Sequence, residues 1–352
     1  MIRLRAGRGV LVVLPLAFCL MLLDARLGHG TTAIAATGIL LGMVLMATRF
    51  SFSAAFAGWL GGERRTLAAH AVMLLSGSLV FAVLLTLEPG LKPNVYPLGM
   101  GVVAGGFLFG MGMQLAAACA SSSLYLTGNG SLNAVLVLAA FMAGTLPGEA
   151  HHITFWNRMS WPPFSLLEHW GWIGVAGQCA VLGGVVWLAA RRQKIDRPLW
   201  LAAGLLGVLN GLVLLLSGKP WGVSTAIAGW AYETAHSLGW SVGPVSKGVA
   251  HMAEVGLVRH PASLLNGAVM AGAMAWSLGQ GTWRPRFDVR PLTLVGQLIG
   301  GLLMGYGSRI VPGCNIGAYF SGIASFSAHG WLWLVMALCG SAAGLRLKTW
   351  FV

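Results

Sequence analysis

Two stretches of the chain share one pattern of glycines that ends in a cysteine. One runs from Gly106 to Cys119 and the other from Gly301 to Cys314, with glycine, leucine and cysteine in the same register. A thiol is a weak hydrogen-bond donor and a polarisable neighbour, so two of them can hold a soft atom without trapping it. Small or polar residues follow each cysteine. A repeated, glycine-interrupted polar segment in an apolar chain predicts the substrate site of a transporter.

The composition of the 352-residue chain is typical of a membrane protein. Apolar residues make up 57% and charged residues only 9%, and the mean hydropathy is +0.76, whereas a soluble domain would carry about 25% charged residues. We predict an all-α polytopic protein in a lipid bilayer, because several runs approach the roughly 20 apolar residues that cross it. These runs are Val10–Leu23, Thr32–Ala47, Thr66–Leu87, Leu132–Leu146, Trp172–Ala190, Leu199–Leu216, Ala262–Leu278, Leu292–Met304 and Trp331–Leu345.

The net charge of +13 indicates orientation rather than a nucleic-acid partner, because the cations gather at the ends of the apolar runs. Cytoplasmic loops of membrane proteins carry an excess of Lys and Arg. The distribution predicts a cytoplasmic N-terminus and fewer cations on the external side. The basic ends expected in the cytoplasm are Met1–Gly9, Arg49, Gly61–Arg65, Arg191–Pro198, Arg284–Arg290 and Arg346–Val352.

The two halves of the chain are similar but are expected to enter the membrane in opposite directions. Thr32–Ala47 leads into the polar segment Arg49–Phe56, and Ala202–Leu216 leads into the segment Pro220–Ile227. Three spans are expected between Leu132 and Leu216, and an odd number inverts the second half. We predict two inverted-topology repeats, residues 1–190 and 199–352, joined by a basic linker at residues 191–198. Inverted repeats place substrate sites near the middle of the bilayer.

Four segments are too short or too polar to span, and we expect them to be re-entrant half-helices that meet at the midplane. Irregular backbone at membrane depth is tolerated only where it lines a cavity or is buried in protein. The first turns of such helices would direct unpaired N–H groups at a common centre, which favours an anion. The four segments are Phe50–Leu60, Cys119–Gly128, Trp221–Trp230 and Cys314–Ser325.

A second explanation exists for the glycines at four-residue spacing, Gly106, Gly110, Gly301 and Gly305. Such glycines also let membrane helices pack closely. The sequence is compatible with both roles, although close packing leaves the polar residues after each cysteine unexplained.

The longest diagnostic run, Gly305–Trp331, resembles the signature of the YeeE/YedE family, bacterial inner-membrane transporters for thiosulfate and related sulfur compounds. Shorter elements, Lys219–Ala226, Cys119–Ser122 and Arg49–Phe52, are similar to the family's other motifs. The resemblance covers nearly the whole chain. It implies location in the cell inner membrane and uptake of thiosulfate, or a related sulfur anion, between thiols at a narrow waist. Members commonly carry a cysteine where this chain has Ser51, so the preferred anion is open.

The residues expected to line the pathway include both cysteines, and we expect neutral thiols there because a thiolate would repel the anion. A disulfide between the cysteines is the alternative. Arg309 is expected either to attract the anion or to hold a neighbouring loop carbonyl, and Asn210 either to bond a broken helix end or to contact substrate. The full set of expected pathway residues is Cys119, Cys314, Ser51, Ser122, Asn315, Gly313, Arg309 and Ser224.

No motif indicates an enzyme, a cofactor or a bound metal. The acidic residues expected in external loops are Glu149, Glu168, Glu233 and Glu254, and the adjacent pair His151 and His152 is expected there too. The absence of a predicted mid-span carboxylate leaves a buried proton relay without support.

Two other functions fit the same pattern. One is a membrane sensor, or import-linked regulator of sulfur oxidation, that hands a signal or sulfur species to a small cytoplasmic sulfurtransferase. The other is a carrier for sulfite or a selenium oxyanion, which differs only in its ligand.

Overall fold

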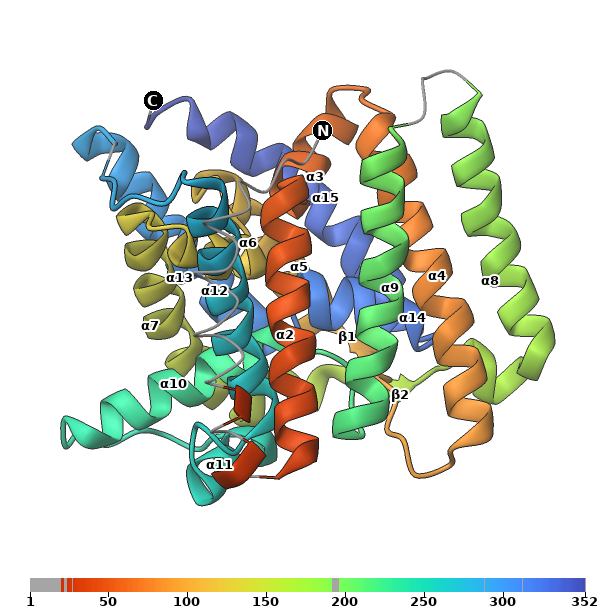
Figure 1. Ribbon diagram of the computed structural model, residues 1–352, viewed down its shortest axis with the longest axis horizontal. Helices are drawn as coiled ribbons and strands as arrows, with labels where there is room; N and C mark the ends of the chain where they lie inside the picture. Colours follow the sequence, from red (N-terminus) through yellow and green to blue (C-terminus); the bar gives the residue numbers. More distant parts are fainter. Residues whose placement is uncertain are drawn as a thin grey trace.

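The computed structural model describes residues 20–21, 24–26, 28–191, 196–287, 289–311 and 313–351 (Figure 1). Almost all of its regular structure is helical, with one two-stranded antiparallel sheet formed by β1 and β2. The elements are α2 (His29–Thr48), α3 (Phe52–Leu60), α4 (Arg65–Leu87), β1 (Pro97–Gly99), α5 (Met100–Leu115), α6 (Ala120–Gly128), α7 (Leu132–Thr154), η1 (Trp156–Met159), β2 (Ser160–Pro163), α8 (Leu166–Ala190), α9 (Arg197–Ser217), α10 (Val223–Ser237), α11 (Lys247–Val255), α12 (Pro261–Gln280), α13 (Pro291–Ile310), the π-helix η2 (Asn315–Ser321), α14 (Gly322–Ala324) and α15 (Ala328–Lys348).

The prediction of a polytopic all-α membrane protein is confirmed. Among the described residues, seven helical segments are long and apolar enough to cross a membrane: α2, α4, α5 taken together with α6 (Met100–Gly128), α7, α8, α9 and α15. An eighth is α13 when η2 and α14 are taken with it. The three spans expected between Leu132 and Leu216 are α7, α8 and α9. Apart from residues 20–21, the predicted span Val10–Leu23 lies outside the described residues, as does Cys19.

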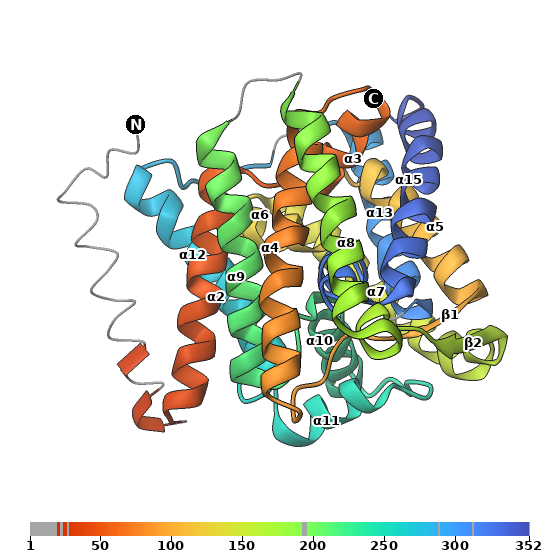
Figure 2. The same cartoon turned by 90° about the vertical axis from the view of Figure 1, so that its right-hand side faces the viewer.

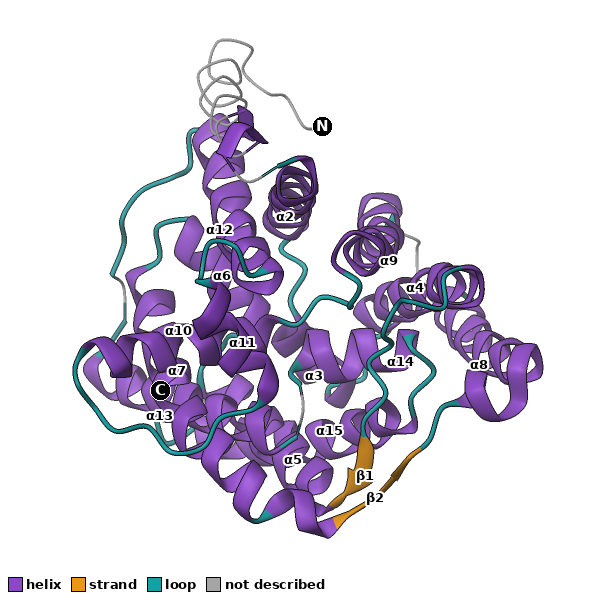
Figure 3. Ribbon diagram, turned by 90° about the horizontal axis from the view of Figure 1, so that it is seen from below, coloured by secondary structure: helices purple, strands orange, loops and turns teal. Residues whose placement is uncertain are grey.

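The four segments that were expected to be too short to span form short helices among the long ones (Figure 3). They are α3, α6, α10 and the pair η2–α14. The helix α10 is longer than predicted, because it continues beyond Trp230 to Ser237. Ser51 precedes α3 and accepts a first-turn N–H, as is typical of an N-cap serine, whereas a cysteine precedes α6 and η2.

The glycine pattern is explained by close helix packing. A Cβ atom on Gly106 or Gly110 would meet the α15 backbone at Trp333 or Ala337. A Cβ atom on Gly301 or Gly305 would similarly meet the α7 backbone. The packing interpretation is therefore confirmed for these four glycines. They let α5 approach α15 and let α13 approach α7, which brings the cysteine-bearing ends of α5 and α13 into the interior.

The contacts between helices occur in matched pairs across the two halves. The helix α4 packs on α9 as α12 packs on α2, and α5 packs on α15 as α13 packs on α7. The short helices follow the same pattern, since α3 contacts α4 and α15 where α10 contacts α12 and α7. In Figure 1, α2 begins at the bottom and α9 begins at the top.

The two ends of the molecule differ in structure. The end of α8, the start of α9 and the end of α15 lie together at the top of Figures 1 and 2, with basic residues such as Arg191 and Arg346. The opposite end carries α11 and the small β-sheet. This second end is the one that holds the cavity described below.

Substitution Gly305→Ala should destabilise the fold, because its Cβ would collide with the carbonyl oxygen of Phe141. Overpacking of this kind costs about 1–3 kcal/mol. Thermal unfolding of the purified protein in detergent should show a lower Tm. The matched control is Gly184→Ala on α8, where nothing lies within 4 Å of the added atom; its Tm should stay or rise slightly, since alanine is favoured over glycine in helices by up to about 1 kcal/mol. Equal effects of the two substitutions would contradict the packing role.

Candidate functional site

Cys314 is the residue on which two broken helices converge. It stands at the start of η2, is fully buried, and its thiol is approached by the backbone N–H groups of Ile316 and Gly317. A third N–H group comes from Ser224 in the first turn of α10. First-turn N–H groups lack partners within their own helix and carry partial positive charge. The thiol therefore lies where two helix N-termini direct positive potential.

Cys119 begins α6 in a similar position and is also fully buried. The Ser122 hydroxyl accepts a hydrogen bond from the Cys119 backbone N–H at 2.6 Å and donates one to the Cys119 thiol at 3.1 Å. The Ser121 hydroxyl lies 3.3 Å from the same sulfur. Cys119 is close enough to Cys314 for the two groups to interact electrostatically, and both are free thiols. The fold thus brings the two predicted cysteines into one region without a covalent bond.

Ser51 stands at the start of α3, near the same region. Its hydroxyl accepts a hydrogen bond from the first turn of α3 at 3.3 Å and lies 3.1 Å from the Ser53 hydroxyl. The Gln114 side chain, at the end of α5, donates to the carbonyl oxygen of Ser53 at 3.0 Å. The ring of Phe56 on α3 packs edge-on against Tyr319 of η2, with centroids 5.7 Å apart. These contacts tie α3 to both cysteine-bearing segments.

Asn315 and Gly313 flank Cys314 and shape its backbone. The fully buried Asn315 side chain donates a weak hydrogen bond to the sulfur of Met113 at 3.6 Å, and its carbonyl oxygen has no partner among the described residues. Gly313 has φ of 139°, and a Cβ there would lie 2.5 Å from the backbone nitrogen of Ala318. Only glycine fits this turn. The neighbouring Pro312 lies outside the described residues.

Two buried asparagines fix the start of α10. The Asn210 oxygen accepts from the Trp221 backbone N–H at 3.1 Å, and its amide donates to the Ser321 hydroxyl at 3.1 Å. Asn266 accepts from the Trp221 indole at 3.3 Å and donates to the Val223 carbonyl at 3.1 Å. Of the two roles expected for Asn210, the structure shows the bonding of a broken helix end, and Asn266 is a second such residue that the sequence did not reveal.

A cavity of about 560 Å³ lies at the end of the molecule that carries α11 and β1. Its wall includes Ser224, Gly313 and Gly317, so it reaches the residues that surround the Cys314 thiol. No acidic side chain of the described residues contributes to this wall. Its basic and histidine side chains are Lys219, Lys247, Arg309, His152, His251 and His260.

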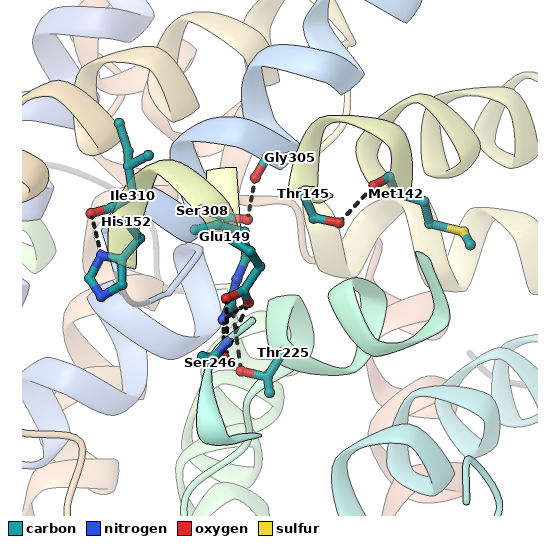
Figure 4. Close-up of polar contacts among 10 residues, drawn as sticks. Met142, Thr145, Glu149, His152, Thr225, Ser246, Gly305, Ser308 and Ile310 are labelled. Carbon is teal, nitrogen blue, oxygen red and sulfur yellow. Dashed lines mark hydrogen bonds and ion pairs between the residues drawn. The ribbon is translucent and has the colours of Figure 1, made fainter. Parts of the chain in front are cut away.

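Arg309 is the most deeply buried cation of this cavity, with 8% of its surface exposed. Its guanidinium forms an ion pair with Glu149, which is 2% exposed. It also donates to the hydroxyls of Thr225 at 3.4 Å and Ser246 at 3.3 Å. The Ser246 N–H and hydroxyl in turn donate to the Glu149 carboxylate at 3.0 and 3.2 Å (Figure 4). Of the two roles predicted for Arg309, the one that binds a loop was expected to use a carbonyl, and the loop group that it bonds is the Ser246 hydroxyl.

The prediction that Glu149, His151 and His152 lie in an external loop is wrong. The helix α7 continues through Pro147 to Thr154 and includes all three. Proline is tolerated in membrane helices because neighbouring groups satisfy the freed backbone. His151 bonds the Tyr306 hydroxyl at 3.0 Å, and His152 lies 3.3 Å from the Ile310 carbonyl oxygen.

The polar partners of Arg309 were not apparent from the sequence, since Ser246 and Thr225 are ordinary loop and helix residues there. Glu149 did leave a signal, because it is an acidic residue that follows an apolar run without an intervening polar loop. The predicted span Leu132–Leu146 stops before Pro147 and therefore leaves Glu149 outside the helix.

These features define a polytopic helical membrane protein with a basic cavity, whose wall includes neighbours of the buried Cys314 thiol. The family model described as "Sulphur transport" matches residues 47–343. The chain belongs to this family, as its resemblance to YeeE/YedE proteins predicted, and it is a membrane transport protein rather than an enzyme.

Several known transporters are similar to the chain, two of them over most of its length. The thiosulfate transporter TsuA of Spirochaeta thermophila is 28% identical over 336 residues, which cover 86% of this chain and 94% of the relative. The thiosulfate transporter TsuA of Escherichia coli is 27% identical over 331 residues, covering 86% and 90%. The probable transporter YedE of Escherichia coli is 24% identical over 150 residues, covering 40% and 35%.

Low pH should lower the stability of the folded protein through His260, which lines the cavity. Burial, and then the charges of His251 and Lys219, lower the pKa of His260 from 6.5 to about 4. Between these values the unfolded chain binds the proton more readily, so this contribution to stability is complete above pH 6.5 and is lost as the pH falls toward 4. The Tm of His260→Gln should therefore fall less than that of the wild type between pH 7.5 and 4.5. The exposed His236→Gln is the control, and an equal response of both variants would contradict the assignment.

Proposed function

We propose that the protein takes up thiosulfate, or a closely related sulfur anion, by passing it from the basic cavity between Cys314 and Cys119. The observation that carries the proposal is the Cys314 thiol, which lies just beyond the cavity wall and is approached by N–H groups of two helix starts. The names of the two relatives that match most of the chain support thiosulfate as the anion.

The chemistry of the anion matches the hydrogen-bond donors and thiols that lie along this route. Thiosulfate is a dianion with hard oxygens at one end and a soft, weakly hydrated sulfur at the other. Helix N-termini and the Ser122 and Ser224 region suit the oxygens, because they offer N–H and O–H donors. A neutral thiol can contact the terminal sulfur as a polarisable neighbour. Conduction requires sites that bind well enough to admit and weakly enough to release.

Ser51 would extend the route toward the cytoplasm. It is half-buried at the start of α3, and its hydroxyl already lies in a chain of hydrogen bonds with Ser53. Arg49, at the end of α2, interacts electrostatically with Tyr125, which also interacts with Cys119. We infer that Cys119 is followed by Ser51 on the way inward, with a hydroxyl in the place of a third thiol.

The route requires the two halves to be inverted repeats, residues 1–190 and 199–352 with a linker at 191–198. The matched helix contacts and the opposite directions of α2 and α9 support this arrangement (Figure 1). The basic ends of α8 and α15 lie at the same end of the molecule, which supports a cytoplasmic position for that end and an external position for the cavity. We place the protein in the cell inner membrane on this basis.

Removing either thiol of the route should impair uptake. Cys119→Ala and Cys314→Ala should each reduce thiosulfate uptake below about a tenth of wild type, the loss expected when a contact worth about 1.4 kcal/mol is removed from the limiting step. Uptake of radiolabelled thiosulfate, measured in cells that lack other thiosulfate importers, tests this expectation.

The controls are Cys179→Ala and Cys339→Ala, since Cys179 is half-buried on α8 and Cys339 is exposed on α15. Full uptake by both Cys119→Ala and Cys314→Ala would refute the thiol route. Negligible flux through the wild type, together with co-purification of a small cytoplasmic sulfurtransferase, would favour the sensor instead. Competition by sulfite or selenite stronger than that by thiosulfate would identify a different anion.

The exposed Lys219 at the cavity should act mainly by attracting the anion. Lys219→Gln should lower the uptake rate at subsaturating thiosulfate by about two- to tenfold at low ionic strength, as expected for one charge of a steering field. The deficit should shrink near 150 mM salt, where the screening length is about 8 Å. Lys348→Gln, at the opposite end, is the control. A deficit that does not depend on salt would show that Lys219 acts by direct contact.

A further inference from the structure

Arg309 and Glu149 form a charged pair at the inner part of the cavity. The arginine lines the cavity together with Gly313, which precedes Cys314. Glu149 is the one acidic side chain among the described residues that is buried. An anion that enters the cavity therefore reaches a cation that already holds a carboxylate.

The guanidinium has donors to spare. Arginine carries five N–H donors, and the Nε group of Arg309 is buried without a hydrogen-bond partner among the described residues. Its contact with the Thr225 hydroxyl is long, at 3.4 Å. The Nη2 group is shared between Glu149 and the Ser246 hydroxyl. Arg309 therefore keeps one donor for which the described residues supply no acceptor.

Glu149 has a second set of partners that would hold it when it leaves the guanidinium. Its Oε2 accepts the Ser246 backbone N–H at 3.0 Å, and its Oε1 accepts the Ser246 hydroxyl at 3.2 Å. These bonds do not involve Arg309. A carboxylate that keeps two hydrogen bonds is far less costly to uncouple from its cation than a bare one.

We propose that Glu149 is a built-in competitor for the transported anion: the anion replaces the Glu149 carboxylate on Arg309, and the return of Glu149 releases the anion toward Cys314. This inference rests on the proposed function. It makes Arg309 an entry site for a divalent oxyanion and Glu149 the group that limits how long the anion stays there.

The exchange solves a problem of release. A charge-assisted bond between a mostly buried arginine and a dianion is strong, and a site that binds too tightly stops conduction. A resident carboxylate weakens the net binding, because every anion bound must displace it. The corresponding position in the first half is the neutral Gln114, which donates to the Ser53 carbonyl. The exchange of the anion with a carboxylate therefore takes place at Arg309 and has no counterpart at Gln114.

A purely structural ion pair predicts a different result. Loss of such a pair would lower stability and the amount of active protein, and it would leave the apparent affinity for thiosulfate unchanged. A competitor predicts that affinity rises when the carboxylate is neutralised.

The test uses Glu149→Gln in the full chain, reconstituted into liposomes. The concentration dependence of thiosulfate uptake is measured, and equilibrium binding of radiolabelled thiosulfate to the detergent-solubilised protein is measured in parallel. We expect the apparent KM and the Kd to fall by about fivefold or more, the lower end of typical coupling between two ligands. The maximal rate per inserted molecule should fall as well, because release becomes slow. Glu254→Gln, an exposed carboxylate on α11, should match the wild type.

The variant Glu149→Asp provides a second measurement if Glu149→Gln does not insert. Its carboxylate is shorter by one methylene group and reaches Arg309 less well, so KM and the maximal rate should fall in the same direction by less. An unchanged or higher KM in an inserted variant would overturn the inference while leaving thiosulfate uptake intact. A wild type that neither binds nor transports thiosulfate would overturn the proposed function, and this inference with it.

Discussion

The rest of the structure depends on the need to satisfy backbone N–H groups at helix starts inside an apolar protein. Each break in a helix exposes several such groups, and the bilayer offers no water to bond them. Buried polar side chains accept some of these N–H groups: Asn210 accepts that of Trp221, and Ser122 accepts that of Cys119. At Cys314 the acceptor is the thiol, which N–H groups of η2 and α10 approach. The positive potential of the starts of η2 and α10 is therefore directed at one sulfur.

Glycine packing makes this arrangement possible. The helices α5 and α13 can end in the interior only because their glycines let them lie against α15 and α7. Each of these two contacts joins one half of the chain to the other, since α5 and α7 belong to the first half and α13 and α15 to the second. Bulky side chains at these positions would separate the helices and open the centre. Close packing and the polar centre are thus two consequences of one glycine-rich pattern.

The two halves share their helix packing but differ in charge. At the end of α13 stands Arg309, paired with Glu149, whereas the end of α5 carries Gln114. Each side chain bonds a short helix of its own half: Arg309 bonds Thr225 of α10, and Gln114 bonds Ser53 of α3. Arg309 lines the cavity, pairs with a carboxylate and keeps an Nε donor without a partner among the described residues. Helices with matched contacts therefore end in chemically different surroundings at the two cysteine-bearing segments.

The sequence by itself determined the class of protein, most of the spans, the four short segments and the family. These follow from local composition, because an apolar run, a glycine spacing or a polar interruption has the same physical meaning wherever the chain folds. Only the tertiary structure decided that Asn210 bonds a helix start, that four glycines serve packing, and that Glu149 is buried against Arg309. Each of these depends on residues that are distant in the chain but close in space, and no local pattern predicts that proximity. The helix α7 is the clearest example, because it continues through Pro147. Its last turns are held by bonds to α13, and neighbouring helices of this kind let a membrane helix tolerate proline.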